Sequence, residues 1–447
     1  MKFKNTLILG IFVIVLAAYV YFVEIVGESK KTEAEEKAKK IFLFEKENVT
    51  NLTLKRGSDT PLVFKKEGVG WLIKKPLEYK ADNDKVEDII SSLYDASKER
   101  TVSENESDFD RFGLGEDRIT VAFTSGMTGI DSLHIGKKNP TASFSFVRKN
   151  NENNVYLTNV SVFNSVAKSL YNFRDKTILE LSRDDVKRIT RIKGKEKIVL
   201  KRDFGKNFEI IEPEVLEADL SKLAPVFNNI INGEVKEFID ESPLDLEKYG
   251  LDDPFIELEF ITGENDAKKT LFIGDKTGKQ YFVKDDSKEA VFKIDSSIVS
   301  TINFSLFEIR NKEIFKFKTD TVNLIKLIYA DSSLVFEKDT LDNWNITSPI
   351  EAKAISWKLR GIVNKIKQLK AQNFLENVKP DLQKWGLSKP QVSVKLQHNE
   401  KLIAEISFGI LKDDNIYIIE NINKKCFLVK KQILEDLLTS TGELKEE

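Results

Sequence analysis

One short pattern occurs three times along this chain, and its spacing constrains the fold more than any other feature. An aromatic residue, a glycine and a leucine are followed by a polar turn and then by a run of alternating apolar and polar residues. A proline precedes the glycine by 37 residues each time (76 to 113, 213 to 250 and 349 to 386). The copies are FGLGEDRITVAF from Phe112, YGLDDPFIELEF from Tyr249 and WGLSKPQVSVKL from Trp385. A fixed internal period of this kind indicates tandem homologous units.

Other landmarks keep the same phase, at intervals of about 136 residues. They are Ile41, Ile178 and Ile314, then Val49, Val186 and Val322, and then Gly136, Gly274 and Gly409. The segments that link the copies also match, because Arg174 and Lys176 in one correspond to Arg310 and Lys312 in the next. We therefore predict three repeat units at 41–177, 178–313 and 314–447, the last of which ends in a short charged tail.

Each unit has the pattern of an α+β fold made mainly of antiparallel strands with two helices. Strands with partial two-residue alternation come first, and an amphipathic helix follows the proline. In the first unit Asn83 or Asp84 is the predicted cap of this helix, and a closing amphipathic helix is predicted over 160–173. The glycine of the repeated pattern is interpreted as a structural corner that leads from the helix into a second sheet, because glycine permits a positive φ or a close backbone approach.

Most large aromatic residues follow the repeat and are predicted to lie in the cores. Trp71, Trp344 and Trp385 fall at fixed repeat positions. Trp357 is the exception, since it lies on the predicted helix of the third unit and has no aromatic counterpart in the other two units.

The first 26 residues predict a membrane anchor. Two lysines precede an apolar run from Leu7 to Val23, and Ile25 and Val26 extend it beyond Glu24. A cleaved signal peptide is the alternative interpretation. The lysines favour a cytoplasmic N-terminus, which places the anchor (7–26) in the inner, cytoplasmic membrane as a single pass and the body outside the cytoplasm. Residues 27–40 then predict a charged, helical stalk.

Charge and cysteine content limit the partners that the chain can have. The chain has 70 Lys plus Arg against 72 Asp plus Glu, so no global positive field exists to attract nucleic acid. Cys426 is the single cysteine and cannot form an intramolecular disulfide.

Catalytic motifs are missing, and we predict no catalytic, cofactor-binding or metal-binding residue. The two histidines, His134 and His398, are isolated and lack a ligand set, and Cys426 aligns with valines in the other units, so all three are interpreted as structural residues. Acidic runs at 106–110 and 240–248 are interpreted as solvated loops. A pair of carboxylates from such runs is the basis of an alternative function, a cell-envelope hydrolase.

The pattern as a whole resembles the bacterial DUF4340 family. The residues that carry the resemblance are the N-terminal anchor, Trp71 and Pro76, FGL at 112–114, LHIGKK at 133–138 and FRDKTIL at 173–179. Members of that family are often encoded beside a gliding-motility-type ABC transporter, which consists of an ATPase, a permease and a second large extracytoplasmic protein. The resemblance implies an accessory subunit of such a system and supplies no catalytic residues.

We therefore expect a membrane-anchored, extracytoplasmic binding or scaffold protein of an ABC-type transport system, without enzymatic activity. Its expected partners are the permease, the ATPase and the second extracytoplasmic subunit. The cell-envelope hydrolase and a purely structural spacer are the alternatives.

Overall fold

The computed structural model describes residues 12, 35–125, 129–203, 205–375 and 381–446. These residues form three sheets of nine strands each, and the three sheets have the same topology. Every pair of strands with an assigned register is antiparallel. We call the parts of the chain that carry these sheets the first, second and third repeats. The predicted fold of three tandem units built mainly from antiparallel strands is therefore confirmed.

Hydrogen-bonded neighbours follow one another in the same order from edge to edge of each sheet. The first sheet consists of β4 (Tyr79–Lys80), β3 (Gly70–Lys75), β2 (Leu62–Glu67), β1 (Val49–Arg56), β6 (Ile119–Ser125), β7 (Ile130–Lys138), β8 (Phe144–Lys149), β9 (Val155–Asn159) and β5 (Arg100–Ser103). The second consists of β13 (Leu216–Glu217), β12 (Glu209–Glu212), β11 (Glu196–Lys201), β10 (Val186–Lys193), β15 (Ile256–Thr262), β16 (Ala267–Thr277), β17 (Gln280–Asp285), β18 (Val291–Asp295) and β14 (Glu237–Asp240). The third consists of β22 (Ala352–Lys353), β21 (Trp344–Ser348), β20 (Ser333–Lys338), β19 (Leu324–Ile328), β24 (Val392–His398), β25 (Lys401–Lys412), β26 (Asn415–Glu420), β27 (Lys425–Lys430) and β23 (Asn373–Phe374).

In the described residues, each repeat carries one long α-helix and two short ones. The long helices are α3 (Asn83–Asp95), α6 (Leu220–Ile231) and α9 (Ser356–Lys367). The short helices are α4 (Ser161–Val166) and α5 (Leu170–Phe173), α7 (Ser296–Ile302) and α8 (Leu306–Ile309), and α10 (Ile433–Leu437) and α11 (Thr441–Leu444). Short 3-10 helices precede the first strand of each repeat, namely η2 (Lys46–Asn48), η4 (Arg183–Asp185) and η6 (Thr319–Thr321). Two more, η3 (Asp110–Phe112) and η5 (Glu247–Tyr249), lead into the corner glycines.

The prediction of a second sheet after the corner is wrong. Strand β6 follows the corner and pairs directly with β1, from Arg56 opposite Ile119 to Val49 opposite Ser125. Strands β10 and β15, and strands β19 and β24, pair in the same way. The corner therefore returns the chain to the sheet that it left, and the two halves of each repeat share one sheet.

Two details of the predicted helices also need correction. The cap of α3 is Asp82, whose side chain accepts a hydrogen bond from the backbone N–H of Lys85. Asn83 is the first helical residue, and its side-chain oxygen instead accepts a hydrogen bond from the N–H of Trp71. The closing helix predicted over 160–173 is divided into α4 and α5, because Ser169 and Asn172 form a capping box that starts a new helix.

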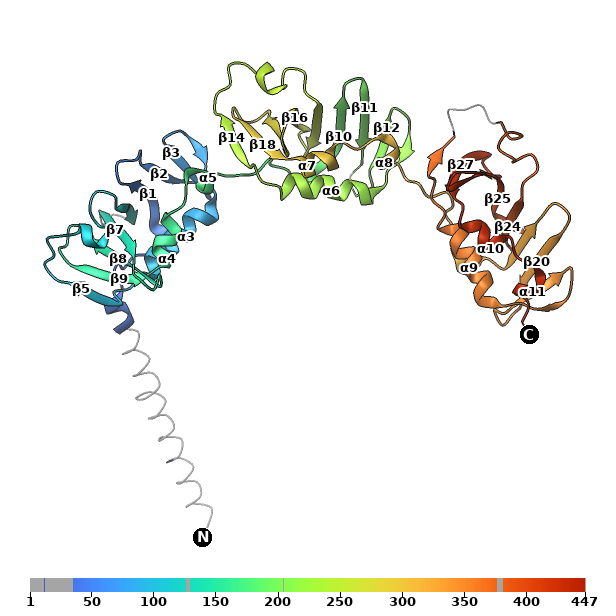
Figure 1. The fold of residues 1–447 in the computed structure, drawn as a ribbon, viewed down its shortest axis with the longest axis horizontal. Coiled ribbons are helices and arrows are strands. Elements are labelled where there is room, and N and C mark those ends of the chain that lie inside the picture. Colours follow the sequence, from blue (N-terminus) through green and yellow to red (C-terminus); the bar gives the residue numbers. More distant parts are fainter. Residues whose placement is uncertain (1–11, 13–34, 126–128, 204, 376–380, 447) are drawn as a thin grey trace, which may run out of the picture. The chain divides into compact units, whose positions relative to one another are not determined.

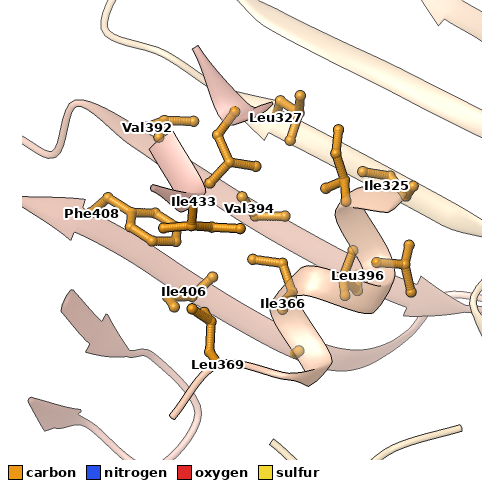
Figure 2. Close-up of a cluster of buried hydrophobic side chains, with 14 of the residues drawn as sticks. Ile325, Leu327, Ile366, Leu369, Val392, Val394, Leu396, Ile406, Phe408 and Ile433 are labelled. Atoms are coloured by element: carbon orange, nitrogen blue, oxygen red, sulfur yellow. The ribbon is translucent and has the colours of Figure 1, made fainter. Parts of the chain in front are cut away.

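The main core of each repeat lies between the long helix and one face of its sheet. In the third repeat α9 and α10 cover that face (Figure 1), and Figure 2 shows Ile366 of α9 and Ile433 of α10 among side chains of strands β19, β24 and β25. The buried residues of α9 are Leu359, Ile362, Val363 and Ile366, which agrees with the helical spacing predicted for them.

A second, smaller core lies under the corner in the first and third repeats. In the first repeat it contains Phe112, Leu114 and Val155, and in the third it contains Trp385, Leu387, Ile419 and Cys426. The aromatic residue and the leucine of the repeated pattern are thus buried together, as the sequence predicts.

The corner depends on a pair of glycines. Gly113, Gly250 and Gly386 have φ values of 69°, 64° and 68°, a left-handed conformation that favours glycine. The second glycine of each pair faces the carbonyl of the corner aromatic residue, because a Cβ on Gly136, Gly274 or Gly409 would lie only 2.2, 2.2 or 2.0 Å from that oxygen. The structural interpretation of the repeated pattern is confirmed.

By compactness the chain divides into two units. The first holds the first sheet together with residues 232–243 and 290–294, which include β14 and most of β18. The second holds the remaining strands of the second sheet and the whole third repeat.

The predicted anchor and most of the predicted stalk lie outside the described residues, apart from Phe12. Residues 35–39 are helical, and Lys40 forms a backbone bridge with Ser97. None of the helices in the described part of the chain is long and apolar enough to cross a membrane.

Candidate binding site on helix α9

The end of each repeat has a shared backbone framework. The residue before the long helix donates its N–H to the last residue of the closing short helix, as Asp82 does to Phe173, Asp219 to Ile309 and Ile355 to Leu444. These bonds align the three repeats residue by residue. In this alignment Trp357 corresponds to Asp84 and Ser221.

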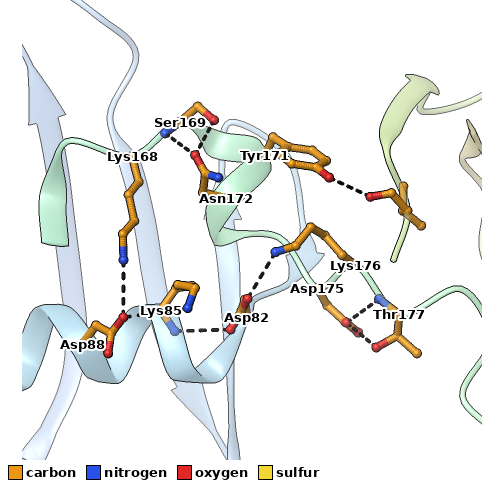
Figure 3. Close-up of polar contacts among 11 residues, drawn as sticks. Asp82, Lys85, Asp88, Lys168, Ser169, Tyr171, Asn172, Asp175, Lys176 and Thr177 are labelled. Atoms are coloured by element: carbon orange, nitrogen blue, oxygen red, sulfur yellow. Dashed lines mark hydrogen bonds and ion pairs between the residues drawn. The ribbon is translucent and has the colours of Figure 1, made fainter. Parts of the chain in front are cut away.

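In the first repeat the framework is completed by polar side chains. Figure 3 shows Asp82, which caps α3 and also accepts an ion pair from Lys176 at 3.2 Å. Figure 3 also shows Tyr171, whose hydroxyl donates 2.7 Å to the carbonyl of Val235. These contacts therefore connect the end of the first repeat to Asp82 on one side and to Val235 on the other.

An arginine in the same linker makes further contacts. The guanidinium carbon of Arg174 lies 3.7 Å from the ring centroid of Tyr79 and 3.4 Å from that of Phe238, and the group forms a two-pronged ion pair with Glu241. Arg310 lies 3.4 Å above the ring of Phe374 at the equivalent place after the second repeat. Planar guanidinium groups favour such stacked, bidentate sites.

The tail of the third repeat keeps the backbone hydrogen bond of the framework but has different side chains around it. Lys445 takes the position of the two arginines and is exposed, and Gly442 takes the position of Tyr171. Ile355 takes the position of Asp82, so the first turn of α9 has no side-chain cap. Among the described residues, the side-chain contacts that Asp82, Tyr171 and Arg174 make in the first repeat therefore have no counterpart at these positions of the tail.

The outer face of α9 carries an exposed tryptophan. Trp357 is 72% exposed, whereas Trp71, Trp344 and Trp385 are 3%, 1% and 6% exposed. One turn further along the helix, Gly361 leaves the space beside the indole open, because a Cβ at this glycine would meet nothing within 4 Å. A glycine in the interior of a helix costs about 1 kcal/mol relative to alanine, so this opening is kept against the preference of the helix.

These residues line a groove of about 940 Å³ between α9 and α11, which we call the Trp357 groove. Its walls are formed by Ile355, Ser356, Trp357, Lys358, Arg360, Gly361 and Asn364 on one side and by Gly442, Glu443, Lys445 and Glu446 on the other. Lys358 joins the two sides, since its ammonium group donates 2.7 Å to the carbonyl of Glu443 and lies 5.7 Å from the indole centroid.

The charge of the long helix changes from repeat to repeat. Helix α9 has four cationic residues and no acidic one, namely Lys358, Arg360, Lys365 and Lys367. Helix α3 has one lysine and four acidic residues, namely Lys85, Asp84, Glu87, Asp88 and Asp95. Helix α6 has a single charged residue, Lys222. A strongly basic helix is therefore specific to the third repeat.

One of the two carboxylates in the groove is already engaged. Glu443 accepts hydrogen bonds of 2.8 Å from the N–H of Ser440 and from the hydroxyl of Thr439, and the Ser440 bond is the main reason that the pKa of Glu443 is lowered. These donors are neutral, so Glu443 keeps its negative charge. The groove lining therefore has three cations, Lys358, Arg360 and Lys445, against the two carboxylates Glu443 and Glu446, which leaves one net positive charge.

A second groove, of about 640 Å³, lies between the β11–β12 hairpin and residues 311–316. Glu217 is at its centre and binds both Lys316 and Asn311, and these two contacts are the largest causes of its lowered pKa. Four cationic side chains and four carboxylates line this groove, so its lining has no net charge. The contacts of Glu217 secure the linker after the second repeat.

Neither histidine nor the cysteine is among the residues that line the Trp357 groove. His134 lies on β7 and is 8% exposed, with its Nδ1 atom 3.0 Å from the Thr120 hydroxyl and 3.4 Å from Nε of Arg118. Burial, followed by the charges of Arg148 and Arg118, lowers the pKa of His134 to about 4. His398 ends β24 at a turn, and Cys426 is buried under the corner, where burial raises the pKa of its thiol.

The acidic run at 106–110 is not simply a solvated loop. The Glu106 side chain is 7% exposed, and its carboxylate accepts hydrogen bonds from the N–H groups of Ser107 and Asp108 and from Arg111. The backbone bond from Asp108 is the largest cause that lowers the pKa of Glu106 to about 2. In the run at 240–248, Glu241 is engaged with Arg174. Within the described ranges, no group of three or more His, Cys, Asp or Glu side chains could hold a metal ion.

Sequence reasoning singled out Trp357 but not the groove around it. The signal was available in the aligned helices, where an acid and a serine in two repeats correspond to tryptophan in the third, and where acidic residues give way to basic ones. The prolines of the repeat supply this alignment, because Asp84, Ser221 and Trp357 each lie eight residues after Pro76, Pro213 and Pro349.

Comparison with known proteins identifies the family of the chain and does not address the Trp357 groove. No curated protein matches the chain. A solved structure of the DNA polymerase III subunit beta from Pseudomonas aeruginosa is similar at 7% identity over 86% of this chain and 92% of its own, with a TM-score of 0.14, and no argument is based on it. The family described as "Domain of unknown function (DUF4340)" matches at residues 71–207, 209–343 and 344–447, and the chain therefore belongs to the DUF4340 family.

Proposed function

We propose that this protein is a membrane-anchored, extracytoplasmic binding or scaffold subunit of an ABC-type transport system. The observation that carries the binding role is the Trp357 groove. An aromatic side chain that is 72% exposed on a well-packed helix costs solvation without helping the core, and the sister repeats have polar residues at this position. Single exposed apolar side chains are common on protein surfaces, so the support comes from the tryptophan together with the basic groove around it.

The class of partner comes from the family resemblance. DUF4340 proteins are often encoded beside a gliding-motility-type ABC transporter, so the permease, the ATPase and a second extracytoplasmic subunit are the proposed partners. The predicted anchor at residues 7–26 supports this role, because it would hold the body at high local concentration beside a permease. The protein would act without catalysis of its own. The hydrolase and spacer alternatives stay predictions.

The proposal is tested by crosslinking in intact membranes. The full chain, tagged at its C-terminus, is expressed at native level, crosslinked, purified under denaturing conditions and analysed by mass spectrometry. Recovery of one permease together with its ATPase supports the proposal. A tagged, unrelated single-pass protein is the control for abundance. If the same two proteins are recovered with this control, or if neither is recovered with the chain, the proposal is wrong.

The orientation is tested separately. We expect protease added to spheroplasts to remove the C-terminal tag while a cytoplasmic marker protein stays intact. Protection of the tag until the membrane is broken would contradict an extracytoplasmic body.

A further inference from the structure

We propose that the Trp357 groove binds a short acidic segment of a partner protein, with one apolar side chain of that segment seated on the indole. This inference rests on the proposed function, because it specifies the chemistry of the partner. Three properties of the groove support it, namely its charge, the rigidity of its aromatic residue and its shape.

The charge of the groove selects an acidic occupant. Lys358, Arg360 and Lys445 line it, and Lys367 continues the basic face along α9. Arg360 and Lys367 are exposed and have no ion-pair partner among the described residues. Opposite charges across an interface guide association and exclude partners of the wrong sign.

The indole provides the central contact. Trp357 is fixed by a helix whose opposite face, Leu359, Ile362, Val363 and Ile366, is fully built into the core. A tryptophan on such a rigid support loses little conformational entropy on binding, and tryptophan and arginine are the residues most often found at binding hot spots. Arg360 lies three residues from Trp357 on the same helical face, so both residue types are present together.

The shape of the site favours a protein segment over a lipid surface. Membrane-surface helices insert a broad apolar face, but the apolar face of α9 is buried, and Trp357 is the single large apolar side chain that this helix exposes. The groove is also bounded on two sides, by α9 and by residues 442–446, which suits one projecting side chain better than a flat bilayer.

The binding test uses the full chain in detergent and a short synthetic peptide of alternating glutamate and glycine with one central leucine. Fluorescence anisotropy of the labelled peptide measures affinity. Comparison probes are the same peptide with serine for leucine, a lysine version of the peptide, and vesicles of phosphatidylglycerol. Because the other three tryptophans are buried, protection of the protein emission from iodide reports on Trp357 directly.

The sister repeats supply variants that preserve the fold. Trp357→Ser installs the residue of the second repeat, and Arg360→Glu installs the charge of Glu87 in the first. We expect Trp357→Ser to weaken binding of the acidic leucine peptide about 30-fold, and Arg360→Glu about 10-fold, as loss of a hot-spot residue and reversal of a charge at an interface. Lys401→Glu on β25, an exposed charge reversal outside the groove, should leave the affinity unchanged.

Specific outcomes would overturn the proposal. It is wrong if the acidic and lysine peptides bind equally, if no peptide binds, or if Trp357→Ser binds as well as the natural chain. Binding of the vesicles without binding of the acidic peptide would identify a membrane surface and would also overturn it. In the crosslinking experiment, equal recovery of the transporter subunits with Trp357→Ser would refute this inference and leave the proposed function standing. If no transporter subunit is recovered with the natural chain, the proposed function is wrong, and the peptide measurements still decide whether the groove binds acidic segments.

Discussion

The corner of the third repeat and the outer face of its helix α9 relate in opposite ways to the two sister repeats. At the corner, Gly386 and Gly409 reproduce the geometry of the other two repeats, with matching positive φ values and equally close carbonyl contacts. On α9, Trp357 and Gly361 stand where the first repeat has two aspartates. Residues that recur in all three repeats therefore specify the fold, and residues that depart from the pattern on an exposed face are where we propose a binding function.

The largest expected effect is at the recurring corner. A Cβ on Gly409 would lie 2.0 Å from the carbonyl oxygen of Trp385, and that atom belongs to the backbone and cannot move aside alone. We expect Gly409→Ala to lower the free energy of unfolding of the third repeat by roughly 4 kcal/mol. Chemical denaturation followed by the fluorescence of the buried tryptophans measures the change.

The matched control is a glycine of the same repeat that departs from the pattern. Gly361→Ala meets no neighbouring atom, and alanine is the better helix former, so the same experiment should show stabilisation by about 1 kcal/mol. If the two variants changed stability alike, the distinction between framework glycines and the open glycine of the groove would fail.

The second comparison is between the linker after the first repeat and the tail of the third. Arg174 is 8% exposed in its side chain, stacked between two rings and paired with Glu241, which is 32% exposed. We expect Arg174→Ala to cost about 2–3 kcal/mol, since it leaves a half-buried carboxylate without its partner and removes two stacking contacts. Denaturation of the full chain measures the loss.

Lys445→Ala tests the equivalent position at the tail. Lys445 is exposed and forms no described ion pair, so its removal should change stability by less than about 0.5 kcal/mol. A loss at Lys445 as large as the loss at Arg174 would show that the tail is secured like the linkers, which contradicts the open groove.

The buried His134 should make the stability of the folded chain depend on pH. His134 has a pKa of about 4 in the folded chain against an ordinary value of 6.5. Between these two values the unfolded chain binds more protons, so the contribution of His134 to stability is complete above pH 6.5 and is lost as the pH falls towards 4. Allowing for partial screening by solvent, we expect a loss of about 1 kcal/mol between pH 7 and pH 5.

His134→Ser, the residue of the third repeat at this place, should remove that pH dependence whatever its effect at pH 7. Denaturation curves at a series of pH values give the slope. His398→Ser at the exposed end of β24 is the control for a general effect of histidine loss. A slope that is unchanged in His134→Ser and reduced in His398→Ser would contradict the assignment.

Much of the fold could be predicted because the sequence pattern of one unit occurs three times. The strands predicted before the first long helix are present as β1, β2 and β3, and the corner glycines show both predicted reasons for glycine, a positive φ and a close backbone approach. The single continuous sheet was missed because pairing of β1 with β6 joins residues far apart in sequence, which alternation within a strand does not report. The division of the closing helix was readable from Ser169 and Asn172, since Ser305 with Glu308 and Ser440 with Glu443 repeat that capping box.

The candidate site was less accessible to prediction. Trp357 was recognised as an exception, but its exposure depends on which face of α9 meets the sheet, and the groove depends on α11, about 80 residues further along the chain. The burial of Glu106 also could not be predicted, because the N–H groups of Ser107 and Asp108 reach its carboxylate only in the folded conformation of the loop.

The smallest expected change in stability is at Trp357, and it decides the comparison. If this side chain served the fold, Trp357→Ser would be costly, as substitution of the 1% exposed Trp344 should be, at about 3–5 kcal/mol. Because the indole is 72% exposed, we expect Trp357→Ser to change the free energy of unfolding by less than about 0.5 kcal/mol. Denaturation of the two variants side by side makes the measurement. A loss comparable to that of Trp344→Ser would show that Trp357 supports the fold, whereas an unchanged stability leaves a partner as the reason for an aromatic residue where the sister repeats have aspartate and serine.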